Sequence, residues 1–216
     1  MIFKAIQNLD SVYTARNKKN RIVAFCVNSN EICIFNPITG LTNEALDNLK
    51  VMGKVSCAIT PNHYHSSALA GFKKEFPRVR LYASLKAIPR LGKQTGLGFT
   101  EIEKIENKLP NGVSFIRPEG LETGEIWIRI KHDGHIAWVV GDAFSGPALS
   151  DEESKTNKVE LLKTFPAYGV EDMERYQSWI LRQIKTDKPK TLIPCHGAIV
   201  QSPKLPQQLV TVATQG

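Results

Sequence analysis

Short apolar runs that end at turn residues predict the strands of this protein. The clearest run, Gly124 to Lys131, alternates between apolar and polar residues, which is typical of a strand with one buried face. Asp133-Gly134 follows it, and this dipeptide favours a two-residue hairpin turn into a second strand, His135 to Val140. The other strands are expected at residues 21–27 and 31–35, which pair as a hairpin, and at residues 55–59, 80–83 and 191–194.

Apolar residues at three- to four-residue spacing predict helices between these strands. Thr42 is a candidate N-cap and Gly53 is a residue type that commonly ends helices. Together they predict a helix over residues 42–52. Residues 170–185 show the same spacing over four turns. Shorter helices are expected at residues 68–76 and at residues 85–91, the second interrupted by Pro89, whereas residues 92–111 are expected to be loop with some helix and residues 144–169 to be rich in loops.

The order of these elements indicates the fold class. A hairpin, a β-α-β-α run, a second hairpin and a final α-β pair predict an α/β domain, with a mixed sheet or two sheets and helices outside. We expect this single domain to span residues 1–216, a length that can bury a sizeable core. The sequence shows no internal repeat and no low-complexity tract.

The composition is ordinary for a globular protein, with 42% hydrophobic and 23% charged residues. The longest apolar runs are far too short to span a bilayer, and the N-terminal residues lack the pattern of a signal peptide. The cysteines show no CxxC spacing, which favours reduced thiols over a disulfide framework. We therefore expect a cytoplasmic protein without a membrane partner.

The charge favours anionic partners. The formal net charge is +7 and the isoelectric point is about 9.2, and a positive field attracts phosphate and carboxylate compounds as well as nucleic acid. A basic surface without any specific partner is the simplest explanation of this charge. No basic run is dense enough, or interleaved with aromatic residues, to indicate nucleic-acid binding. We expect a small anionic substrate rather than nucleic acid, and nothing indicates the oligomeric state.

Candidate metal ligands follow three of the predicted strands. His63 and His65 lie in a turn after the strand at residues 55–59, Asp142 follows the strand that ends at Val140, and His196 follows the strand at residues 191–194. Ligands of open α/β sheets bind at the carboxyl ends of strands, so these side chains are expected to line one edge. Imidazole nitrogen and carboxylate oxygen are ligands of zinc and related divalent metals. The alternatives are structural histidines and a turn aspartate.

The same residues carry a resemblance to the metallo-β-lactamase fold superfamily, which covers roughly residues 21–208. Asn36-Pro37 resembles its Asp-Pro or Asn-Pro after the second strand, Gly141-Asp142-Ala143-Phe144 its Gly-Asp strand end, and Pro194-Cys195-His196-Gly197 its final His-Gly. The resemblance implies a four-layer αββα sandwich and a hydrolase with one or two metal ions. It also implies that Asp142 stands where the family's aspartate bridges two metals.

The chain departs from the family's first motif, His-x-His-x-Asp-His. Counted from His63, the motif's aspartate and last histidine become Ser67 and Ala68. Counted so that His65 is the last histidine, Asn62 and Tyr64 replace an earlier histidine and the aspartate instead. Glu122 stands in place of the family's middle histidine. The Pro-Asn-x-x-His turn is similar to that of a branch of the superfamily for which no reaction is established.

These observations lead to two hypotheses. The first is a hydrolase with a reduced metal site, in which His63, His65, Asp142 and His196 hold one zinc or other divalent ion that activates water. Asp142 and His65 are its expected catalytic residues. The second is a metal-free protein that kept the fold, lost the chemistry and serves as a binding or scaffold protein, as the missing ligands suggest.

Overall fold

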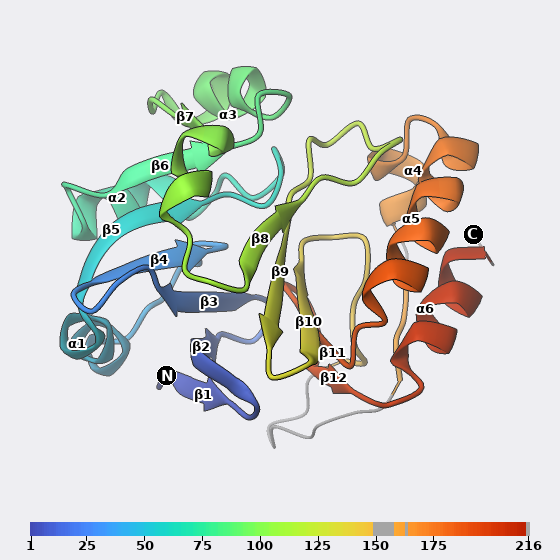
Figure 1. Ribbon diagram of the computed structural model, residues 1–216. Helices are drawn as coiled ribbons and strands as arrows, with labels where there is room; N and C mark the ends of the chain where they lie inside the picture. The colour runs from blue at the N-terminus through green and yellow to red at the C-terminus, as the bar shows by residue number, and fades with distance from the viewer. Residues whose placement is uncertain (149–157, 163, 215–216) are drawn as a thin grey trace. The chain divides into compact units, whose positions relative to one another are not determined.

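The computed structural model describes residues 1–148, 158–162 and 164–214. The chain divides into two compact units, Met1–Asn111 and Gly112–Gly216, each with its own sheet and helices (Figure 1). The single domain expected over residues 1–216 stays a prediction.

The first unit is built on a seven-stranded sheet with the strands in chain order. Its strands are β1 (Lys4–Ile6), β2 (Leu9–Arg16), β3 (Arg21–Cys26), β4 (Glu31–Phe35), β5 (Lys54–Ile59), β6 (Arg80–Ala83) and β7 (Thr100–Glu101). Neighbours are antiparallel from β1 to β4 and parallel from β4 to β7. The predicted hairpin at residues 21–35 is therefore confirmed, and the strand end that precedes the histidine turn lies beside other carboxyl ends.

Helix α1 (Asn43–Met52) begins and ends close to where the sequence predicts. The Thr42 side chain accepts a hydrogen bond from the backbone N–H of Ala45 at 3.3 Å, as expected of an N-cap. At the other end Gly53 has a φ of +146°, and a Cβ there would lie 2.9 Å from the Asn30 carbonyl oxygen. Leu49 is fully buried in one apolar cluster with residues of β3, β4 and β5, which fixes the helix on its sheet.

The remaining helices of the first unit follow the parallel strands. They are α2 (Leu69–Glu75), α3 (Ile88–Thr95) and the 3-10 helix η1 (Ile102–Lys108). The prediction that Pro89 interrupts a helix was wrong, because α3 begins at Ile88 and carries the proline in its first turn, where no backbone N–H is needed. Leu91 packs in a small cluster with Leu69 and Ala83, so α3 is attached to α2 and β6.

The second unit contains a five-stranded sheet in the order β12-β11-β10-β9-β8. Its strands are β8 (Val113–Ile116), β9 (Trp127–His132), β10 (His135–Val140), β11 (Thr191–Pro194) and β12 (Val200–Gln201). The Asp133-Gly134 hairpin is confirmed, with positive φ at both turn residues. Only β10 and β11 run parallel, so their carboxyl ends leave this sheet together.

Helices α4 (Phe165–Gly169), α5 (Met173–Asp187) and α6 (Leu205–Thr214) complete the second unit. Trp127, Trp138 and Phe144 are fully buried in the core that these helices share with the sheet. The helix expected at 170–185 is confirmed with slightly later ends. The loop expected at 144–169 is confirmed except for α4, and residues 149–157 and 163 of it lie outside the described residues.

None of the helices in the described part of the chain combines the length and the apolar character that crossing a bilayer requires.

Leu49 tests the packing of α1 on its sheet. We expect Leu49→Ala to lower the free energy of unfolding by about 2–4 kcal/mol, because it leaves a cavity in a fully buried cluster. Val51→Ala is the matched control, since Val51 lies on the same helix and is 88% exposed, and it should change stability by less than about 0.5 kcal/mol. Urea unfolding followed by circular dichroism measures both, and equal losses would contradict this packing.

Candidate metal centre

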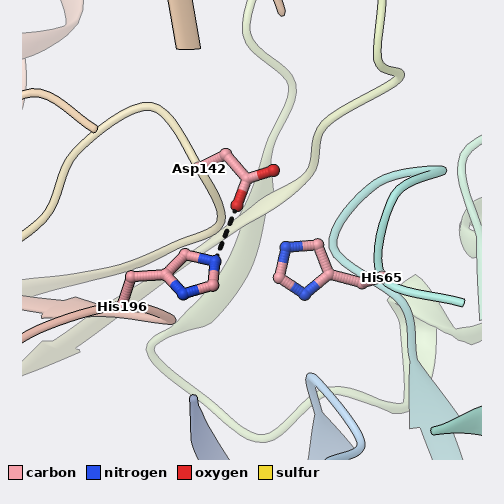
Figure 2. Close-up of side chains that lie close together, drawn as sticks. All are labelled: His65, Asp142 and His196. Atoms are coloured by element: carbon pink, nitrogen blue, oxygen red, sulfur yellow. Dashed lines mark hydrogen bonds and ion pairs between the residues drawn. The ribbon is translucent and has the colours of Figure 1, made fainter. Parts of the chain in front are cut away.

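The parallel pairing of β10 and β11 brings two predicted ligands together in the second unit. Val140 pairs with Pro194, and the Cys195 backbone N–H donates to the Val140 carbonyl at 2.9 Å. Asp142 and His196 each lie two residues beyond this last pair. Figure 2 shows the result: His196 Nε2 lies 3.0 Å from Asp142 Oδ1, and the Asp142 side chain is buried.

Glu125 holds the loop that carries Asp142. Its buried carboxylate accepts hydrogen bonds from the backbone N–H groups of Asp142, at 3.1 and 3.2 Å, and of Ala143, at 3.3 Å. It also accepts one from the Trp127 indole at 2.6 Å. A Cβ at Gly141 would lie 2.9 Å from Glu125 Cδ, so the glycine before Asp142 is what allows this carboxylate to approach.

Sequence reasoning considered Glu122, not Glu125, as the acidic group of this segment. Glu122 is exposed, and its backbone N–H donates to the Gly169 carbonyl. The two residues are three positions apart in one turn-rich stretch, so the pattern alone does not distinguish them. The contact with Asp142 joins distant parts of the sequence, and no local signal reports it.

Two buried or partly buried tyrosines near Asp142 and Glu125 have raised pKa values. Burial raises the pKa of the Tyr168 hydroxyl above its usual range, and the negative charge of Asp142 and a hydrogen bond to its carboxylate raise it further. Burial also raises the pKa of Tyr176, with a smaller contribution from the charge of Glu125. Both hydroxyls therefore stay protonated near neutral pH, and Tyr168 acts as a donor toward Asp142. The carboxylates of Asp142 and Glu125 are the charges that act on these tyrosines, and such charges favour a cation nearby.

In the first unit, Asn36 determines which nitrogen His65 presents. Asn36 follows β4 with a φ of +58°, and its Nδ2 donates to the Arg21 carbonyl at 2.7 Å. The amide oxygen must then be the atom that lies 2.7 Å from His65 Nδ1, so that nitrogen carries the proton. With the proton on Nδ1, the lone pair of His65 lies on Nε2. This is the arrangement by which proteins orient a metal-binding histidine.

The turn that carries His65 is ordered by Asn62, which is fully buried. The Asn62 side chain accepts from the Tyr64 backbone N–H at 2.8 Å, and its carbonyl accepts from that of His65 at 3.3 Å. His63 has a different partner from His65, because its Nε2 lies 3.0 Å from Nη1 of Arg90. A metal ion at that nitrogen would have to displace a guanidinium.

The predicted site residues thus fall into two groups. Asp142 and His196 meet in the second unit, as Figure 2 shows. His63 and His65 belong to the first unit and bond to different groups there. Ala68, which stands where the family motif has a histidine, is buried and offers no donor. The sequence offers Asn36 only as a match to the family, and no sequence pattern marks Arg90 or Tyr168 as a site residue.

Comparisons with protein-family models and with curated proteins find no match. Solved structures do resemble this chain. A fragment of a diflavin flavoprotein from Nostoc sp. PCC 7120 is 12% identical, with a TM-score of 0.68 over 99% of this chain and 96% of that one. The rubredoxin oxygen:oxidoreductase of Desulfovibrio gigas is 11% identical, with a TM-score of 0.71 over 99% of this chain and 62% of that one.

A third similar structure is the metallo-β-lactamase FIM-1 from Pseudomonas aeruginosa in its mono-zinc form. It is 12% identical, with a TM-score of 0.65 over 99% of this chain and 94% of that one. Identities this low establish the fold alone. The chain has the metallo-β-lactamase fold, as its sequence predicted.

Proposed function

We propose that this protein is a metal-dependent hydrolase with a reduced site, which holds one zinc or related divalent ion and acts on a small anionic substrate. The proposed ligands are His65, Asp142 and His196. The observation that carries the proposal is the pair formed by Asp142 and His196, a buried carboxylate and an imidazole 3.0 Å apart at the ends of two parallel strands. The metallo-β-lactamase fold supports it, because structures similar to this chain include a zinc form.

Each proposed ligand offers a donor atom of a kind that such an ion binds. Asn36 fixes His65 so that Nε2 presents its lone pair, and Asp142 and His196 offer an oxygen and a nitrogen. Three protein ligands of this kind are typical of catalytic zinc sites, which keep a further position for water or substrate. A divalent ion held there would lower the pKa of a bound water to about 7 and so supply a nucleophile at neutral pH.

Three other side chains hold the proposed ligands in position. Glu125 holds the backbone of Asp142 and Ala143, which fixes the position of the Asp142 carboxylate. Tyr168 donates to that carboxylate and remains protonated, so it orients Asp142 without adding a charge. Asn36 does the same for His65. Asp142 and His65 are the proposed catalytic residues, since both would hold the ion that activates the water.

His63, the fourth ligand predicted from the sequence, has a competing partner. Its Nε2 lies against the Arg90 guanidinium, which cannot lose its proton at physiological pH. His63 as a metal ligand therefore stays a prediction, and its substitution separates the two arrangements.

The second candidate is a metal-free binding or scaffold protein. Ser67 and Ala68 favour it, because they replace an aspartate and a histidine of the family's first motif and Ala68 is buried at the start of α2. Metal content distinguishes the two candidates. The cytoplasmic location and the absence of a nucleic-acid partner stay predictions.

Zinc content tests the metal site. After loading with zinc and gel filtration, we expect about one ion per chain by mass spectrometry of the metal. His65→Ala and Asp142→Asn should lose most of it, because each removes a ligand, and His132→Ala should keep it, because His132 lies at the β9–β10 turn. His63→Ala should also keep it if Arg90 is the partner of His63.

A metal ion that binds only the folded protein also raises the melting temperature of that protein. If the unchanged protein contains no zinc, or if zinc does not alter its melting temperature, the metal-free candidate is favoured. Equal zinc in all four variants would place the ion elsewhere.

Asn36 tests the orientation of His65. We expect Asn36→Gly, which tolerates the positive φ but removes the acceptor, to weaken zinc binding by about 10- to 100-fold. Asn36→Asp keeps an oxygen against Nδ1 but loses the bond to the Arg21 carbonyl, so it should retain more of the affinity than Asn36→Gly. Competition with a chromogenic chelator measures both. Unchanged affinity in Asn36→Gly would show that His65 needs no such partner.

Glu125 tests the support of Asp142. We expect Glu125→Gln to lower the free energy of unfolding by about 1–3 kcal/mol, because an amide group cannot accept from all of these donors. Zinc affinity should fall by about tenfold as Asp142 loses its support. Glu122→Gln is the control, since Glu122 is exposed in the same stretch, and it should change neither quantity. Equal effects in the two variants would contradict this role.

A further inference from the structure

Arg90 lies beside the histidine turn of the first unit. It stands in the first turn of α3, and its Nη1 lies 3.0 Å from His63 Nε2 and 3.5 Å from the Tyr64 hydroxyl. Its guanidinium carbon lies 4.4 Å from the centre of the Tyr64 ring, in cation–π contact. Three separate contacts thus hold one exposed guanidinium in a fixed place.

The groups that hold Arg90 are themselves fixed. His63 is only 5% exposed, and its ring packs edge-on against Tyr64 with the ring centres 4.4 Å apart. The Tyr64 backbone is held by buried Asn62, and α3 is attached to α2 and β6 through Leu91. Little conformational entropy is therefore left to lose when Arg90 binds a ligand, which favours binding.

None of these contacts neutralises the charge of Arg90. His63 accepts through its neutral nitrogen, and Tyr64 contributes a hydroxyl and a ring face. Within the described ranges, no Asp or Glu carboxylate forms an ion pair with Arg90. The two hydrogens of Nη1 suffice for His63 and Tyr64, which leaves those of Nη2 and Nε for another acceptor.

The positive charge of the protein is concentrated in the same unit. Residues 1–111 contain 16 Lys and Arg against 8 Asp and Glu, whereas residues 112–216 contain 12 against 13. Exposed Lys93, one helical turn beyond Arg90, adds to the local field. An anion is therefore attracted to the unit in which this guanidinium stands.

We propose that Arg90, positioned by His63 and Tyr64, binds an oxyanion group of the ligand, either a phosphate or a carboxylate of a small molecule. Guanidinium groups recognise both through paired N–H···O bonds. The inference rests on the proposed function in one respect, since it names the residue that would bind the anionic part of the substrate. It assigns His63 to Arg90 rather than to a metal ion.

Titration of the purified protein with inorganic phosphate, and separately with acetate, at constant ionic strength tests this site by NMR. We expect the Nε–Hε signal of Arg90 and the ring signals of Tyr64 to shift and saturate. Arg90→Gln should weaken binding by about tenfold or more, and Arg90→Lys should weaken it less, because it keeps the charge but loses the planar fork. Saturation by either anion supports the site, and the stronger of the two identifies the group.

Arg78→Gln is the matched control, because it removes the same charge from an exposed arginine that lies before β6. It should bind phosphate as the unchanged protein does. The proposal is overturned if neither anion shifts these signals, if Arg90→Gln binds as well as the unchanged protein, or if Arg78→Gln is equally weakened. The measurement needs neither zinc nor turnover, so its failure would leave the zinc measurements standing, and their failure would leave this one interpretable.

Discussion

The parallel pairing of β10 with β11 is the constraint on which the candidate site depends. Since Val140 lies opposite Pro194, the chain leaves the sheet twice at the same point, and Asp142 and His196 come into contact without any long loop to guide them. A shift of this register by one residue would turn the side chains of the shifted strand to the other face and would move Asp142 and His196 apart along the strands. The fully buried tryptophans of the second unit oppose such a shift, because Trp138 would leave the core with it.

Buried polar side chains then fix what the strands bring together. Glu125 binds the backbone beyond β10, Asn36 binds His65, and Asn62 binds the turn between β5 and α2. Each is almost fully buried, and each has its acceptor oxygens occupied by donors. A buried polar group costs stability unless it is bonded in this way, so these three residues tie the geometry of the site to the stability of the fold.

The sequence predicts the parts of this structure that local patterns determine. The alternation in β9, the Asp133-Gly134 turn and the Thr42 cap each follow from neighbouring residues. The sequence does not predict the β1–β2 hairpin, because Asn8 and Ser11, rather than glycines, adopt the positive φ there and no Gly or Pro marks the turn. Nor was α6 predicted, whose segment includes β-branched Val210, Thr211 and Val212 and so carries a weak helix signal. The strand-end positions of the ligands were predictable, but Glu125 and Arg90 act through contacts across the fold.

Gly141 and Glu125 illustrate how such contacts restrict change. A Cβ at residue 141 would lie 2.9 Å from the Glu125 carboxyl carbon, so any side chain there would push this carboxylate away from the backbone N–H groups that it accepts from. A shorter residue at 125 would give room but would release the backbone beside Asp142. The two positions are therefore free to diverge only together, and a lineage that altered one alone would lose order at Asp142, the candidate metal ligand, before it gained anything in return.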